Sequence, residues 1–113
     1  MRIVVCIKQV PDTAEVKIDP ETNNLVRQGI PSIMNPFDYT ALAEALRLKR
    51  ENGGTITVIS MGPEQVKKEL KMCLKMGADR AVLLSDRKLG GADTLATGYA
   101  LAEAIKKIGG DLI

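Results

Sequence analysis

The chain has 113 residues, of which 45% are apolar and 27% charged, a composition that predicts one folded domain. A formal net charge of +2 and an aromatic content of 3% argue against nucleic acid as a partner, since such surfaces use clustered basic residues and stacking aromatics. Histidine is absent, which excludes histidine-dependent triads and zinc sites, and we predict neither a catalytic side chain nor a metal site.

The N-terminus predicts neither a secretory signal nor a membrane anchor. Its apolar run, residues 3–7, breaks at Lys8, whereas a signal peptide needs about 7–15 apolar residues. No later run approaches the roughly 20 apolar residues of a membrane span. The two cysteines, Cys6 and Cys73, lie far apart in apolar segments, so we expect reduced thiols in a cytoplasmic protein.

Short apolar runs predict the strands of a parallel sheet. Residues 3–7 are apolar and mostly β-branched, as in a strand that is buried on both faces. Runs of similar character follow at 55–59 and 81–84, and a fourth begins at 112–113. Because helical segments separate them, we expect an α/β fold, Rossmann-like, with an open parallel sheet and helices on both faces.

Three helices are predicted between these strands. The first begins at Asn35 as N-cap, with Pro36 in the first helical position, and stops at residues 52–54. The second is expected from Gly62-Pro63-Glu64 to Gly77, and the third from Asp93 or Thr94 to Gly109-Gly110.

The apolar spacing of each helix predicts which side is buried. Residues three and four positions apart share one face of a helix, so repeated apolar residues at this spacing indicate the face toward the sheet. The expected buried residues are Tyr39, Leu42, Ala43 and Leu46 in the first helix, Val66, Leu70, Cys73 and Leu74 in the second, and Leu101, Ala104, Ile105 and Ile108 in the third.

A long segment separates the first strand from the first helix. Residues 14–18 and 25–27 have strand character and flank a turn-rich stretch at 19–24, which predicts a small β-hairpin excursion at the sheet edge. At the C-terminus, the sequence stops at Leu112-Ile113, inside the predicted fourth strand. We therefore expect a truncated fold, in which residues 1–113 form the N-terminal part of a nucleotide-binding or flavin-binding α/β domain.

The sheet topology indicates where a ligand would bind. In an open parallel sheet, ligands bind beyond the carboxyl ends of the strands, where the helix N-termini also point. This selects the loops at 9–13, 60–63 and 85–94, together with the helix start at 35–38.

The loop at 89–94 is the most suggestive of these. Gly90 and Gly91 permit close approach of the backbone to a ligand, and the N–H groups of the following helix attract an anion such as phosphate. Thr94 and Thr97 would add two hydroxyls on one helix face. An ordinary loop with an N-cap explains the same residues, and the two common glycine-rich phosphate fingerprints are absent.

Five blocks of sequence resemble the β subunit of electron transfer flavoprotein, in the order and at the spacings of that family. The resemblance implies a heterodimer with an electron transfer flavoprotein α subunit. Its partners would be a flavin-containing dehydrogenase or a quinone oxidoreductase, without insertion into a membrane. The five blocks are Val4–Thr13, Asn35–Asp38, Ser60–Pro63, Met76–Arg80 and Gly91–Thr97.

The resemblance also implies a set of cofactor-binding residues. Family members place AMP in this site, or FAD where they perform electron bifurcation. The block at 91–97, after Ser85-Asp86-Arg87, is similar to the bifurcating group and implies that Asp93 caps the helix while Thr94 and Thr97 bind the flavin. The positions implied for the nucleotide are Cys6, Asn35, Pro36, Phe37, Asp38 and Met61.

We favour FAD over AMP as the cofactor, and hence electron bifurcation from NADH. One electron would pass to a ferredoxin or flavodoxin and the other to the flavin of the α subunit. A first alternative is a β subunit that holds AMP structurally while the α subunit carries the only FAD. Further alternatives are a non-redox adenine-nucleotide module similar to universal stress proteins and a purely structural subunit.

Overall fold

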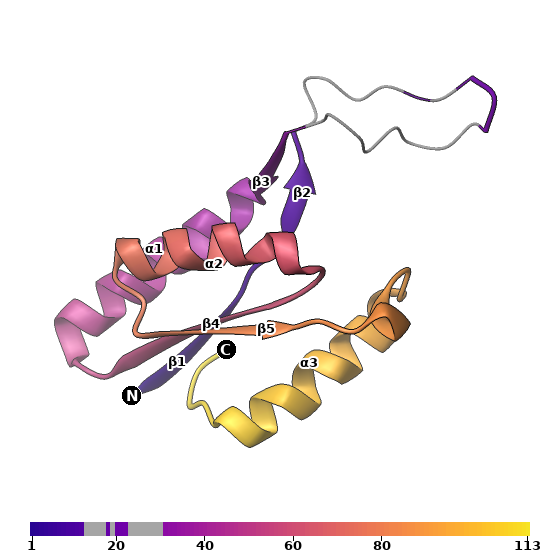
Figure 1. The fold of residues 1–113 in the computed structure, drawn as a ribbon. Helices are drawn as coiled ribbons and strands as arrows, with labels where there is room; N and C mark the ends of the chain where they lie inside the picture. The colour runs from indigo at the N-terminus through magenta and orange to yellow at the C-terminus, as the bar shows by residue number, and fades with distance from the viewer. Residues whose placement is uncertain (13–17, 19, 23–30) are drawn as a thin grey trace.

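The centre of the fold is a three-stranded parallel sheet (Figure 1). Its strands lie in the order β1 (Arg2–Cys6), β4 (Thr55–Met61), β5 (Arg80–Leu84). Leu112 forms a parallel bridge with Ile3 on the edge of β1 that β4 does not occupy, so the fourth strand begins there. The predicted open parallel sheet is confirmed. The computed structural model describes residues 1–12, 18, 20–22 and 31–113.

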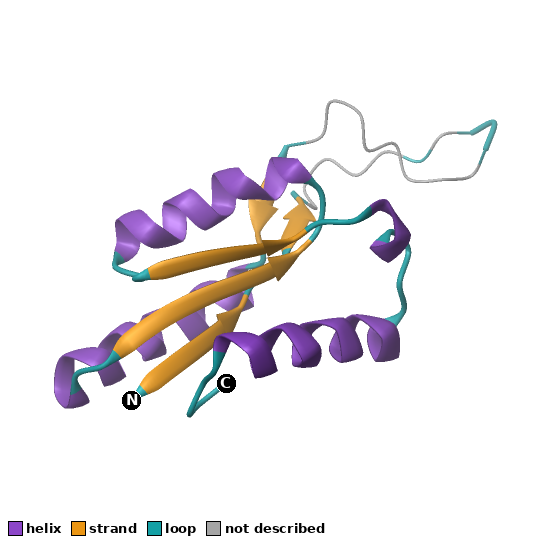
Figure 2. Cartoon of the chain, turned by 60° about the horizontal axis from the view of Figure 1, so that its bottom comes forward, coloured by secondary structure: helices purple, strands orange, loops and turns teal. Residues whose placement is uncertain are grey.

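Helices cover both faces of this sheet, as predicted (Figures 1 and 2). Helix α1 (Pro36–Asn52) and helix α2 (Lys67–Met76) lie on one face, and α3 (Thr94–Ile108) lies on the other. The chain passes from β1 to β4 and β5 in one direction and then returns past β1. Since crossovers are right-handed, this reversal moves α3 to the opposite face. Short 3₁₀ turns precede α2 and α3, at η2 (Glu64–Val66) and η3 (Arg87–Leu89).

The helix boundaries follow the capping signals in the sequence. The Asn35 side-chain oxygen accepts a hydrogen bond from the Phe37 backbone N–H at 3.0 Å, which caps α1. Gly53 ends α1, with φ +72° and its N–H donating to Lys49 O at 2.8 Å. Asp93 caps α3 in the same way as Asn35 caps α1. Among the described helices, none is long and apolar enough to cross a membrane.

The main core lies between the sheet and the α1–α2 layer. Leu42 of α1 is fully buried, and Leu46 packs beside it. The predicted face of α1 was wrong at Tyr39 and Ala43, which are exposed, because the buried stripe continues through Ala45 instead. The buried residues of this core are Ile3, Val5, Ile7, Met34, Leu42, Ala45, Ile56, Val58, Val66, Leu70, Cys73 and Ala78.

In the second predicted helix, one apolar residue expected to be buried is exposed, and one charged residue is buried. Leu74 is 41% exposed, although its spacing predicted burial, whereas Glu69 is 2% exposed. The α-helical part of this segment begins at Lys67 and not at the predicted Gly62-Pro63-Glu64, because a 3₁₀ turn occupies residues 64–66. Successive residues are 120° apart around a 3₁₀ turn and 100° apart around an α-helix. An α-helical spacing that is counted across residues 64–66 therefore shifts the predicted buried face for the residues that follow.

Helix α3 is less buried than predicted. Its residues Leu101, Ala104, Ile105 and Ile108 are only half-buried, and none of its side chains is fully buried. Outside this apolar side, Leu95 is 81% exposed and Tyr99 is 70% exposed.

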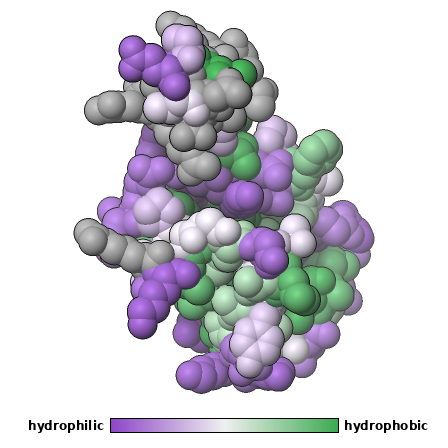
Figure 3. All heavy atoms as spheres, turned by 90° about the vertical axis from the view of Figure 1, so that its right-hand side faces the viewer, coloured by the Kyte–Doolittle hydropathy of each residue, from purple (hydrophilic) through white to green (hydrophobic). Residues whose placement is uncertain are grey.

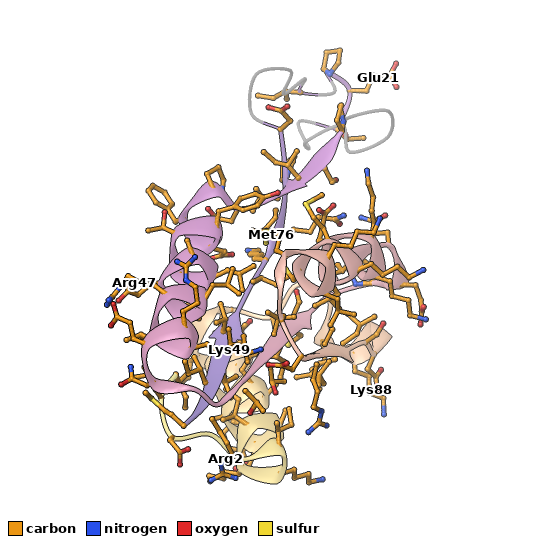
Figure 4. All side chains as sticks on the ribbon, turned by 90° about the vertical axis from the view of Figure 1, so that its left-hand side faces the viewer. Arg2, Glu21, Arg47, Lys49, Met76 and Lys88 are labelled. Carbon is orange, nitrogen blue, oxygen red and sulfur yellow. The ribbon has the colours of Figure 1, made fainter. Side chains whose placement is uncertain are left out.

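An ion pair connects the C-terminal half of α1 with the start of β5. Lys49 Nζ contacts both carboxylate oxygens of Asp79 at 2.9 Å, on the inner side of α1, whereas Arg47 points outward (Figure 4). The Asp79 carboxylate also accepts the Ile56 backbone N–H at 2.8 Å. The Lys49 hydrogen bond, followed by the Ile56 N–H, lowers the pKa of Asp79.

Two short strands form the base of the predicted hairpin. Strand β2 (Gln9–Pro11) pairs with β3 (Ser32–Met34) in antiparallel register, as a sheet separate from the main one. The sequence predicts a loop at 9–13, so these two strands are a difference from the prediction. Apart from residues 18 and 20–22, the predicted strands at 14–18 and 25–27 and the turn between them lie outside the described residues.

Candidate functional site

The strand order selects one position at the carboxyl edge of the sheet, beside the end of β1. The chain proceeds from β1 to β4 and β5 and then returns to the far side of β1 at Leu112. The connection from β1 to β4 therefore covers one face of the sheet, and the connection from β5 to Leu112 covers the other. Such a reversal leaves a crevice at the carboxyl end of the strand, where α/β proteins bind their ligands.

Cys6 and Met61 share one face of the sheet near this edge. In the register, Cys6 pairs with Ile59, and Met61 lies two positions further along β4. Val5 and Val58 point to the other face, into the core beneath α1 and α2. Because side chains alternate along a strand, Cys6 and Met61 face the α3 side, and both are half-buried.

The start of α1 is fastened to the end of β1 through the backbone of Lys8. The Lys8 N–H donates to Asp38 Oδ2 at 2.7 Å, and the Lys8 carbonyl accepts from the Asn35 N–H at 2.8 Å. These bonds bring Asn35 and Asp38 beside the strand that carries Cys6. In this block Pro36 is exposed and Phe37 is 83% exposed, so the aromatic ring is available at the edge.

Two causes suppress ionisation of the Cys6 thiol. Burial raises the pKa of Cys6, and the negative charge of Asp38 raises it further. A thiol in this setting stays protonated at neutral pH, which disfavours a role as a nucleophile and agrees with the interpretation from sequence.

The Asp38 effect predicts a change in cysteine reactivity. In the Asp38→Asn variant, the amide oxygen still accepts the Lys8 N–H, but the charge is lost. We expect the pH midpoint for alkylation of Cys6 to fall, because the thiolate no longer faces a carboxylate. Mass-spectrometric rates of iodoacetamide labelling at Cys6, compared across pH between the variant and the wild type, measure this. An unchanged Cys6 profile would contradict the assignment.

The start of α3 offers free backbone donors. Asp93 Oδ1 accepts from the Ala96 N–H at 2.8 Å, and the Asp93 carbonyl accepts from the Thr97 N–H at 2.9 Å. The first N–H groups of a helix have no acceptor within the helix, which leaves those of Thr94 and Leu95 for an anion. The side chain of Thr94 is exposed and that of Thr97 is half-buried.

Apolar surface accompanies the start of α3. In a view onto the carboxyl edge, apolar residues gather over the lower half of the face, below a band of hydrophilic residues (Figure 3). The exposed Leu95 belongs to the first turn of α3. A ligand with both a flat apolar part and an anionic part would match this combination.

The predicted site residues form two groups in the structure. Cys6, Asn35 and Asp38 are joined around Lys8, and Met61 shares the sheet face of Cys6. Asp93, Thr94 and Thr97 belong to a second group at the start of α3; within the described part of the chain, no hydrogen bond joins the two. The sequence selected the 9–13 loop without giving Gln9 a role, and it did not indicate the buried Glu69, to which Gln9 is hydrogen-bonded beside the first group.

Two hollows on the surface lie away from this edge. One, of about 580 Å³, lies beside α3 and includes Arg2, the first residue of β1, so it is near the opposite end of that strand. The other, of about 400 Å³, is lined by Lys68, Lys71, Met72 and Lys75 along α2. Neither is lined by any of the predicted site residues.

Comparison with known proteins identifies the family. The electron transfer flavoprotein domain matches residues 22–113. The chain is 62% identical over 112 residues to the electron transfer flavoprotein subunit beta of Megasphaera elsdenii, covering 98% of the chain and 42% of that protein. It is 54% identical over 112 residues to protein FixA of Azotobacter vinelandii, covering 99% of the chain and 40% of that protein.

A third relative is subunit CarD of the caffeyl-CoA reductase-Etf complex of Acetobacterium woodii. It is 60% identical over 109 residues, covering 96% of the chain and 42% of that protein. The chain thus spans less than half the length of these relatives. The matches favour the resemblance found in the sequence over a universal-stress-type module. The chain belongs to the electron transfer flavoprotein family.

Proposed function

We propose that residues 1–113 are the N-terminal part of an electron transfer flavoprotein β subunit that binds FAD at the carboxyl edge of the sheet. The observation that carries the proposal is that the residues implied by the family coincide with the ligand position expected from the sheet topology. The positions implied by the family, including Cys6 and Asp38, lie at the topological switch point beside β1. The chain is also 62% identical to a protein named as such a subunit.

The residues at this edge match the chemistry of a dinucleotide. The unpartnered N–H groups at the start of α3, with the Thr94 hydroxyl, would hold phosphate oxygens. Phe37 and the half-buried Met61 would contact flat rings. Asn35 and Asp38 are already bonded to the chain, so they would shape the site through the Lys8 backbone.

FAD, when bound, would accept a hydride from NADH and divide its electrons between a ferredoxin or flavodoxin and the flavin of an α subunit. The chain's own part is to bind and orient this group and to exclude water from it. We propose a heterodimer with the α subunit, working with a flavin-containing dehydrogenase or quinone oxidoreductase in the cytoplasm. Similarity of the 91–97 block to bifurcating members supports FAD over AMP.

A nucleotide count tests the proposal. The full polypeptide that carries this chain is co-expressed with its α subunit, and nucleotides released from the purified complex are separated and quantified. Two FAD molecules per heterodimer are expected. One FAD with one AMP would instead identify the structural-AMP alternative, and one FAD with no second nucleotide would contradict binding at this edge.

The two threonines of α3 provide a sharper test. In the Thr94→Ala/Thr97→Ala double variant, two hydroxyls are lost, while the Asp93 cap and its bond to Ala96 remain. We expect the second FAD to be depleted several-fold and the α-subunit FAD to be retained, because only one site loses donors. Flavin absorbance and released-nucleotide analysis measure this. Wild-type occupancy of both sites would remove the threonines from the site.

A further inference from the structure

A buried carboxylate lies at the start of α2, outside the residues so far assigned to the site. Glu69 is 2% exposed and sits among core residues, with Leu70 beside it in the chain and Cys73 one turn further along. Burial of a carboxylate is unfavourable unless hydrogen bonds replace its water. A helix that only needed to pack on the sheet would be served better by an apolar residue here.

A chain of side-chain hydrogen bonds connects Glu69 to the end of β1. Gln9 Nε2 donates to Glu69 Oε1 at 3.3 Å, and Gln65 Nε2 donates to Gln9 Oε1 at 2.9 Å. Gln9 therefore presents its amide nitrogen to Glu69 and its amide oxygen to Gln65. Glu69 and Gln65, one helical turn apart, thus hold Gln9 in a single orientation.

Gln9 directly follows Lys8, the residue whose backbone joins the end of β1 to the start of α1. Lys8 is bonded through both of its backbone groups to the start of α1, at Asp38 and Asn35. The junction of β1 and β2 is therefore held by α1 through the backbone of Lys8 and by α2 through the side chain of Gln9. Burial, and then the charges of Glu69 and Asp38, raise the pKa of Cys73, so both carboxylates lie near one end of the core.

We propose that Glu69 is a positioning residue for the nucleotide site and acts through Gln9. Its carboxylate fixes the β1–β2 junction, which in turn fixes the position of Cys6 and the start of α1 at the carboxyl edge. The proposal deepens the proposed function and rests on it, since it assigns a residue to the same site. Glu69 itself does not touch the nucleotide.

Substitutions at position 69 separate the hydrogen bond from the charge. The Glu69→Gln variant keeps an oxygen that accepts from Gln9, whereas Glu69→Leu removes the acceptor while filling the space. In the complete heterodimer, stripped of the β-site nucleotide but retaining the α flavin, calorimetric titration with AMP reports on the adenosine and phosphate contacts. We expect Glu69→Leu to weaken AMP binding about 3- to 10-fold and Glu69→Gln to bind like wild type.

An exchange of the two partners gives a second test. In Gln9→Glu, two carboxylates face each other, and we expect weakened AMP binding. In Gln9→Glu/Glu69→Gln, the amide at position 69 donates to the carboxylate at position 9, and we expect affinity to return toward wild type. Hydrogen exchange at the Lys8 and Gln9 amides should rise and fall in parallel with these changes.

A matched control separates positioning from general destabilisation. Leu48→Ala removes a partly buried side chain near the C-terminal end of α1, away from the junction. We expect it to lower stability without changing AMP affinity. If Glu69→Leu lowers only stability, with normal AMP affinity and normal exchange at Lys8, the inference is overturned. If wild type binds neither AMP nor FAD at this edge, the proposed function fails, and exchange at Lys8 alone still reports whether Glu69 holds the junction.

Discussion

Replacing Leu42 with alanine is expected to lower the free energy of unfolding by about 2–5 kcal/mol, the range for removal of a large core side chain. Leu42 is fully buried where α1 packs on the sheet, so its loss leaves a cavity that the rigid strands cannot fill. Urea denaturation followed by circular dichroism measures the change. Because Leu42 lies in the second turn of α1, near the Asn35–Asp38 block, weakened packing there should also lower occupancy of the proposed nucleotide site.

The matched control is Leu74→Ala in α2. Leu74 has the same chemistry and the same predicted burial, yet it is 41% exposed. We expect a loss of about 1 kcal/mol or less, as for a surface substitution. Equal destabilisation by the two substitutions would mean that the packing of α2 differs from the structure described above.

The strands of the main sheet could be predicted from sequence because their signal is local. A run such as 3–7 is apolar on both faces, so its burial does not depend on which face meets which helix. Capping is equally local: Asn35 and Asp93 bond to N–H groups two and three positions away. Such features need no knowledge of the remaining fold.

Helix orientation was less predictable because it depends on partners distant in sequence. The apolar spacing of α1 predicted burial at Tyr39 and Ala43, which are exposed. The spacing alone does not indicate how much of the helix surface the sheet covers. Glu69 gives the opposite case. Its burial is explained by Gln9, a residue of β2 that no helical periodicity could associate with it.

The candidate site was predictable in position but not in detail. The rule for parallel sheets, and independently the family resemblance, selected the edge where Cys6 and Asp38 meet. Neither indicated that the Asp38 carboxylate accepts a hydrogen bond from the Lys8 backbone N–H. This bond joins residues 30 positions apart, so only the folded chain discloses it.

Replacing Gly54 with alanine is the second substitution for which we expect a large loss of stability. Gly54 has φ +109°, a conformation that side-chain-bearing residues rarely adopt, and an added Cβ would overlap the backbone oxygen of Met1. That oxygen accepts the Thr55 N–H at 3.0 Å, beside the paired residues Arg2 and Thr55 that begin the β1–β4 register. The variant must therefore distort both strands at once.

The expected loss combines about 1–3 kcal/mol for the backbone conformation with about 1–3 kcal/mol for the overlap. Gly53→Ala is the control, because Gly53 also has positive φ, at +72°, but no atom lies within 4 Å of an added Cβ. It should show only the first contribution. The urea midpoints of the two variants separate these contributions. A larger loss of stability for Gly54→Ala confirms that the Met1–Thr55 contact sets the β1–β4 register. Equal midpoints would show that β1 can shift without penalty. Since β1 carries Cys6 to the carboxyl edge, the same shift would displace a residue of the proposed nucleotide site.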